Sequence, residues 1–77
     1  MRELQVIFHS PREIAQFVQI AACQPGEIDV TLDERTVNGK DMLGMFTMEL
    51  SRALLISFSG EETDFRNFED NIRTFLA

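Results

Sequence analysis

The sequence predicts a small α+β fold in two layers, a mostly antiparallel sheet with helices on one side. Short segments that alternate apolar and polar residues, the pattern of half-buried strands, are interspersed with segments that carry one apolar stripe at helical spacing. They follow the order strand, helix, strand, strand, helix, strand, helix (βαββαβα). Because each strand has one apolar face and each long helix one apolar stripe, stacking the helices on one face of the sheet buries both.

The first strand and helix are expected before residue 24. Residues 3–8 alternate polar and apolar and predict the strand. A complete helix start follows, in which the Ser10 hydroxyl caps, Pro11 suits the first helical position and Glu13 completes a capping box. The helix then has one apolar stripe, formed by Ile14, Phe17, Val18 and Ala21. We expect it to end near Cys23, because a proline and a glycine follow.

The middle of the chain predicts a hairpin and a short helix. Residues 28–32 alternate as a second strand, 33–34 form a tight turn, and 35–37 form a short third strand that ends at Asn38-Gly39. An apolar helix of about two turns is then expected from Lys40. Its apolar residues are Met42, Leu43, Met45 and Phe46.

The C-terminal part predicts one more strand and one more helix. Residues 54–58 alternate as the fourth strand, and Gly60 ends it. The closing helix has apolar residues at i, i+3, i+7, i+10 and i+11, with almost only polar residues between them. These are Phe65, Phe68, Ile72, Phe75 and Leu76.

This order of elements fits two ways of wiring the sheet. A ferredoxin-like sandwich places the first and third strands in the middle. An open-faced sandwich has the strand order 1-4-2-3, with three helices on one face. The shortness of the second helix favours the open-faced sandwich.

Composition narrows the class of protein. The chain has 77 residues, enough for one domain over residues 1–77. Its net charge of −6 argues against a nucleic-acid surface, which needs clustered Lys and Arg. No apolar run approaches the ~18 residues of a membrane span, and residues 1–8 lack the apolar stretch of a secretory signal, so we expect a cytoplasmic protein.

Cys23 is the only cysteine, which excludes an intramolecular disulfide and metal sites built on paired cysteines. We expect Cys23 to be a small buried filler, and we expect no cofactor and no metal.

Two motifs in the chain resemble those of the HPr family, the histidine-containing phosphocarriers of the bacterial sugar phosphotransferase system. Residues 37–44 read Val-Asn-Gly-Lys-Asp-Met-Leu-Gly, close to the family's Val-Asn-x-Lys-Ser-apolar-apolar-Gly. Counting back without a gap to the family's Gly-Leu-His-Ala-Arg-Pro-Ala places Ser10 at the phosphohistidine and Arg12 at the arginine. Phe17 and Val18 then match the apolar pair that follows. The resemblance covers essentially the whole chain and implies the strand order 1-4-2-3.

The departures from the family pattern concern the phosphoryl chemistry. Neutral imidazole is a suitable phosphoryl acceptor, whereas the Ser10 hydroxyl is a weak nucleophile without a base, and its phosphate ester is too stable to pass on. Glu13, in place of the family's proline, would repel a bound phosphate. The chain is therefore similar to regulatory paralogues that have lost the histidine, and Ser10 is interpreted as a plain N-cap.

His9 offers an alternative acceptor one residue earlier. A one-residue slip would let the only histidine of the chain take the phosphoryl group. The competing interpretation is a surface histidine, because the alternation of residues 3–8 points its side chain away from the core. The gapless spacing to Lys40 favours the second interpretation.

Asp41 stands where some family members carry a regulatory serine. A carboxylate at a helix start interacts favourably with the helix dipole and needs no further role. The functional alternative is partial mimicry of a phosphoserine, with one charge and two oxygens only.

The second helix is expected to be a docking surface. In the family, its apolar residues and the start of the first helix contact partner proteins, and Met-rich patches adapt to different partners. We expect Leu43 to point inward, and at least two of Met42, Met45 and Phe46 to be exposed and contiguous near Arg12. Core packing is the competing explanation.

The sequence thus favours a non-enzymatic HPr-like protein that binds other proteins. Candidate partners are components or regulators of the phosphotransferase system, or a second copy of this chain; nucleic acid and membranes are not expected. The alternatives are an active phosphocarrier that uses His9, and an HPr-like fold with an unrelated protein-binding role.

Overall fold

The computed structural model describes residues 1–77 and has the predicted order of elements, βαββαβα. The last helix is followed by a single 3₁₀ turn, Arg73–Phe75. The elements are β1 (Arg2–Val6), α1 (Pro11–Ala22), β2 (Glu27–Leu32), β3 (Arg35–Asn38), α2 (Met42–Met45), β4 (Leu54–Ser59) and α3 (Glu62–Asn71). None of the helices has the length and apolar composition needed to cross a membrane.

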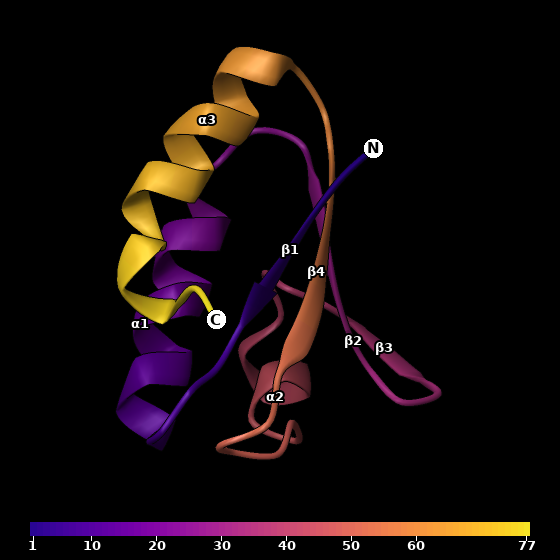
Figure 1. The fold of residues 1–77 in the computed structure, drawn as a ribbon, viewed down its shortest axis with the longest axis vertical. Helices are drawn as coiled ribbons and strands as arrows, with labels where there is room; N and C mark the ends of the chain where they lie inside the picture. Colours follow the sequence, from indigo (N-terminus) through magenta and orange to yellow (C-terminus); the bar gives the residue numbers. More distant parts are fainter.

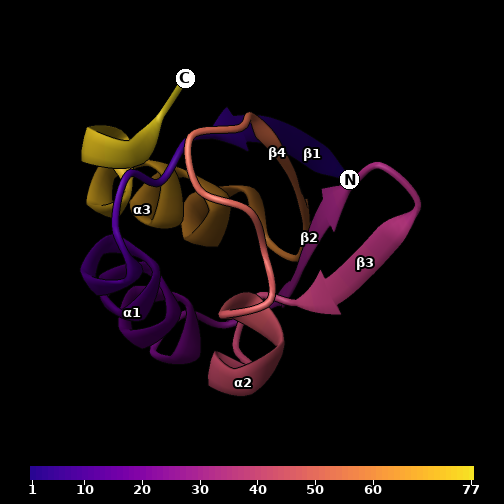
Figure 2. The same cartoon turned by 90° about the horizontal axis from the view of Figure 1, so that it is seen from below.

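The four strands form one antiparallel sheet in the order β1-β4-β2-β3, which confirms the open-faced wiring. β4 is central and pairs with both β1 and β2. All three helices cover the same face of this sheet (Figures 1 and 2). The ferredoxin-like alternative is excluded, because β1 and β3 are the two edge strands.

The core is a layer of phenylalanine rings between the sheet and the helices. Six of the seven phenylalanines are buried, and only Phe46 is exposed. The rings of Phe8 and Phe17 lie 5.3 Å apart edge to face, and Phe8 contacts Phe75 at the same distance. Phe58 of β4 continues the layer, with its ring 5.5 Å from Phe65 and 5.7 Å from Phe68. This layer joins β4 and the segment after β1 to α1, α3 and the C-terminal turn.

The start of α1 matches the prediction with one difference. Ser10 is the N-cap, and its Oγ accepts a hydrogen bond from the N–H of Glu13 at 3.3 Å, while Pro11 occupies the first turn. The Glu13 carboxylate accepts from the N–H of His9 at 2.8 Å, whereas a standard capping box would use the N–H of Ser10. The carboxylate therefore reaches one residue further back and fixes the strand-to-helix junction.

The two later helices are shorter than predicted. α2 is a single turn that begins at Met42, because a turn at residues 38–41 keeps Lys40 outside it. In that turn Asn38 Oδ1 accepts from the N–H of Lys40 at 2.9 Å. α3 ends at Asn71, and the chain then turns back so that the N–H of Ala77 donates to the carbonyl of Gln5 at the β1 edge.

Cys23 is exposed, so its prediction as a buried filler is wrong. The buried stripe of α1 runs through Phe17 and Ala21, and the next position on that side is Gln24. Gln24 is the residue that enters the interior there, while Cys23 caps the helix end and faces outward.

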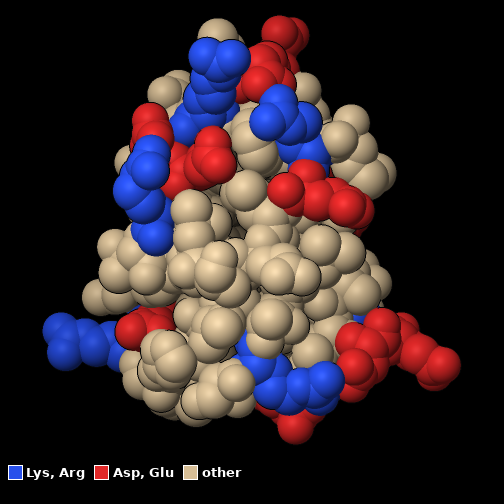
Figure 3. Space-filling model, in the orientation of Figure 1, with Lys and Arg blue, Asp and Glu red and all other residues tan.

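Acidic and basic side chains are intermixed on the surface. On the face drawn in Figure 3 they gather in two groups, toward the upper and lower ends of the molecule, and each group contains both signs of charge. The band between the groups is uncharged (Figure 3).

The capping role of Ser10 makes a stability prediction. Ser10→Ala should lower the free energy of unfolding by about 0.5–2 kcal/mol, since an N–H at the helix start loses its acceptor, whereas Ser10→Asp keeps an acceptor and should change it little. Urea denaturation measures both variants, with Ser57→Ala on the open face of the sheet as control. An unchanged midpoint for Ser10→Ala would refute the capping role.

Candidate functional site

The first candidate group lies at the start of α1. His9 is exposed, as the alternation predicted, and its side chain takes part in no hydrogen bond. Arg12 is also exposed, and its guanidinium belongs to none of the ion pairs of the molecule. Both side chains are thus free to meet a ligand or a partner.

Polar side chains of the protein itself already accept hydrogen bonds from backbone N–H groups at this helix start. The free N–H groups and dipole of a helix N-terminus attract an anion. Here the Ser10 hydroxyl already accepts from the N–H of Glu13, and the Glu13 carboxylate already accepts from the N–H of His9. A phosphoryl group at this position would meet the negative charge of Glu13 at close range.

The second candidate group is α2, and its orientation differs from the expectation. Met45 is fully buried and Leu43 is 81% exposed, so the expectation that Leu43 points inward is wrong, and so is the expectation that Met45 is a docking residue. Met42 is half-buried and packs against the core. Phe46 is 45% exposed and Leu50 38% exposed. Leu43, Phe46 and Leu50 are the exposed large apolar residues of this segment, and together with the half-buried Met42 they are called the apolar patch below.

The spacing of the residues explains this orientation. Met45 and Met48 are three residues apart and both are buried, so they form the inward side of the segment. Leu43 and Phe46 are also three residues apart, which places them together on another side. Both pairs are present in the sequence, and burial shows that Met45–Met48 is the inward one.

The segment that contains the apolar patch runs along α1 from its end to its start. Lys40 Nζ donates to the carbonyls of Gln24 at 2.7 Å and Gly26 at 2.9 Å, just after α1 ends. At the other end of the segment, the N–H of Ser51 donates to the carbonyl of Phe8 at 2.7 Å, just before α1 begins. About 18 Å of helix therefore separates the two anchor points.

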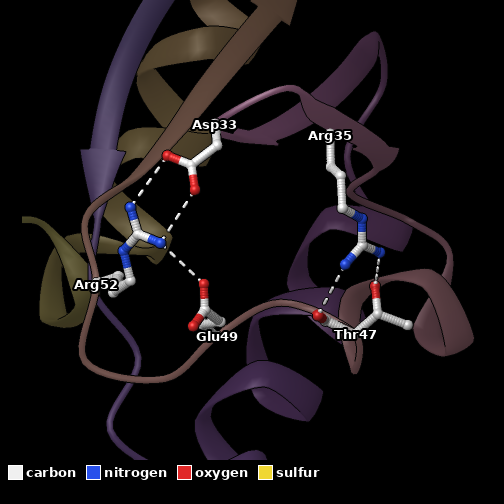
Figure 4. Close-up of polar contacts among 5 residues, drawn as sticks. All are labelled: Asp33, Arg35, Thr47, Glu49 and Arg52. Carbon is white, nitrogen blue, oxygen red and sulfur yellow. Dashed lines mark hydrogen bonds and ion pairs between the residues drawn. The ribbon is translucent and has the colours of Figure 1, made fainter.

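Two arginines attach the same segment to the β2–β3 hairpin (Figure 4). Arg52 donates to both carboxylate oxygens of Asp33, at 3.0 and 3.1 Å, and to Glu49 at 2.8 Å. Arg35 donates to the carbonyl and hydroxyl oxygens of Thr47. Hydrogen bonding to Asp33 and then to Glu49 raises the pKa of Arg52 above its ordinary value. Contacts between exposed charged groups contribute little to stability, so these orient the segment more than they stabilise the fold.

Asp41 lies at the N-cap of α2 and is exposed. Its side chain makes no capping hydrogen bond, although its carbonyl accepts from the N–H of Met45 at 2.9 Å. The carboxylate therefore presents its charge to solvent at the end of the segment that lies near Lys40.

Comparison with solved structures identifies this arrangement. No protein-family model and no curated protein matches the sequence. The crystal structure of HPr-C-His from Thermoanaerobacter tengcongensis is 25% identical and has a TM-score of 0.77, over 96% of this chain and 93% of that one. The phosphocarrier protein HPr from Bacillus anthracis is 22% identical, with a TM-score of 0.70 over 91% and 94%. The histidine-containing phosphocarrier protein of Mycoplasma is 14% identical, with a TM-score of 0.75 over 95% and 89%.

The fold thus defines a class, the open-faced sandwiches formed by phosphocarrier proteins. Within that class the chain is a divergent HPr-like protein, similar to each of these structures over most of its length and at low sequence identity.

The orientation of α2 can be tested by a pair of alanine variants. Met45→Ala should lower the free energy of unfolding by about 2–5 kcal/mol, because it leaves a cavity in the core. Leu43→Ala should change it by no more than about 0.5 kcal/mol, because the side chain is already in water. Denaturant titration of both variants gives the comparison; equal losses, or a larger loss for Leu43→Ala, would contradict this orientation.

Proposed function

We propose that this chain is an HPr-like binding protein of the bacterial sugar phosphotransferase system or its regulatory network, acting in the cytoplasm. It docks to other proteins and does not pass on a phosphoryl group. The observation that carries this proposal is the apolar patch, which is exposed on a segment anchored at both ends of α1.

The apolar patch has the physical properties of a docking surface. Leaving Leu43 and Phe46 in water costs about 25 cal/mol for each Å² of apolar surface that a partner could cover. The buried Met45 and Met48 hold the patch from below, and the arginine contacts hold its loop from the side. The patch is therefore positioned in advance, which lowers the entropy lost on binding.

Arg12 supplies the charge expected beside such a patch. It lies in the first turn of α1, and the Leu50 end of the patch approaches that turn through the Ser51–Phe8 hydrogen bond. A partner with an apolar centre and a carboxylate at its rim fits these two features. A free guanidinium can donate to such a carboxylate in a bidentate manner.

The loss of phosphoryl transfer is inferred from the groups at the helix start. Ser10, at the position that resembles the family's phosphohistidine, is committed to capping α1. No side-chain base accepts a hydrogen bond from its hydroxyl, so nothing activates it as a nucleophile. The Glu13 carboxylate next to it opposes the approach of a phosphate.

The second candidate function is an active phosphocarrier that uses His9. One observation favours it: His9 is exposed immediately before the N-terminus of a twelve-residue helix, next to the free Arg12. The same Glu13 carboxylate counts against it, since it is bound to the N–H of His9. This candidate requires a phosphorylated His9, whereas docking alone does not.

The docking proposal is tested by titrating the protein with Enzyme I of the phosphotransferase system in a calorimeter. Wild type should bind, and Phe46→Glu should bind at least about tenfold more weakly, because it places a charge in an apolar contact. Leu55→Glu, the same change on the open face of the sheet, is the matched control and should bind as wild type does. Circular dichroism checks that both variants fold. Equal binding by Phe46→Glu and wild type, or no binding by wild type, would overturn the proposal for this partner.

A further inference from the structure

A groove between α1 and α3 lies apart from the apolar patch. The two helices run side by side in both views (Figures 1 and 2), and the groove is formed near the end of α1 and the turn after α3. Its volume of about 590 Å³ falls within the range of small-molecule sites. It is lined by Gln16, Gln19, Ile20, Cys23, Gln24, Asn71, Thr74 and Phe75, none of which belongs to the apolar patch.

The lining combines amides with an apolar floor and has no charged side chain. Four of its eight residues carry a carboxamide, although 26% of all residues in the chain are charged. Each carboxamide offers both a donor and an acceptor. Ile20 is half-buried and Phe75 is buried, so both can provide apolar contact beneath these amides.

Gln24 is the polar residue of the groove whose hydrogen bonding indicates a ligand site. It is only 8% exposed, and its backbone is held in place by Lys40 on the carbonyl and by Ala21 on the N–H. Its side-chain amide makes no hydrogen bond within the protein. Every side-chain polar atom that is fully enclosed in the molecule does have a hydrogen-bond partner. The unpaired amide of Gln24 must therefore keep its contact with solvent, and the groove that it lines provides that contact.

An amide that contacts solvent and has no protein partner is a hydrogen-bonding group with which a ligand can pair in place of water. A ligand that covers this amide without pairing with it leaves a donor or an acceptor buried and unsatisfied, which is costly, so the groove discriminates against such ligands. An amide in the ligand matches a carboxamide by one donor and one acceptor. A charged ligand finds no opposite charge in the lining and would lose its hydration.

We propose that this groove binds a small, uncharged, amide-bearing molecule of the size of a capped dipeptide. Its amide pairs with the carboxamide of Gln24, and its apolar part lies against Ile20. The site is independent of the docking function proposed above, because it uses no residue of the apolar patch and lies beside α3.

The test is a titration with N-acetyl-alanyl-alanine N-methylamide, followed by nuclear magnetic resonance. The side-chain amide signal of Gln24 and backbone signals of residues 16–24 and 71–75 should shift and saturate. Gln24→Leu should weaken binding at least fivefold, and Gln5→Leu, on the open face of the sheet, should leave it unchanged. If Gln24→Leu does not fold, Asn71→Ala on the exposed rim takes its place, with the same expectation.

Two comparison ligands decide the chemical class. The same dipeptide with a free carboxylate should bind at least fivefold more weakly, and glucose, a neutral polyol, should not shift the Gln24 amide. Tighter binding of either than of the capped dipeptide would overturn the proposal.

Cys23 gives an independent readout, because it is the only thiol in the chain and it lines the groove. Its reaction with N-ethylmaleimide, followed by mass spectrometry, should slow several-fold in the presence of saturating capped dipeptide. An unchanged rate, or shifts that appear only outside the two named segments, would show that the groove is not the binding site.

Discussion

The packing of phenylalanine rings between sheet and helices is the interaction on which the rest of this molecule depends. A domain of this size buries only about 60% of its unfolded surface, so each large side chain counts. Full burial of one ring contributes about 1.5–3 kcal/mol. Phe8 contacts both Phe17 and Phe75, and Phe58 contacts Phe65 and Phe68. The rings thereby fix α1, α3 and the C-terminal turn against β4 and the segment after β1, in a chain that has no disulfide.

This packing determines what the surface can present. Phe8 is buried immediately before the exposed His9, and its carbonyl anchors the N–H of Ser51. Lys40 anchors the opposite end of the same segment. Once Met45 enters the core between these anchors, Leu43 is left outside. The exposure of the apolar patch is thus a consequence of the core and of two anchor points far apart along α1.

Much of the fold could be predicted, because alternation and helical stripes report directly on burial. The stripe of α1, its Ser10 cap and the alternating residues of β2 and β4 all lie where their patterns indicated. The buried side of the single-turn helix α2 could not be predicted. Four residues are too few for an apolar stripe, and the choice between Leu43 and Met45 depended on the turn before the helix. Cys23 was misplaced for a similar reason, because its side depends on where α1 ends. The groove, with the unpaired amide of Gln24, could not be predicted, since it arises from two helices distant in sequence.

We propose that the scaffold retains a docking surface while its helix start does not accept a phosphoryl group. The most direct measurement is incubation with Enzyme I and phosphoenolpyruvate, followed by intact-mass spectrometry at neutral pH. We expect an unmodified chain, because the Ser10 hydroxyl has no activating base and the Glu13 carboxylate opposes a phosphate at the helix start. An acid-labile phosphoryl group that is present in wild type and absent in His9→Ala would contradict it.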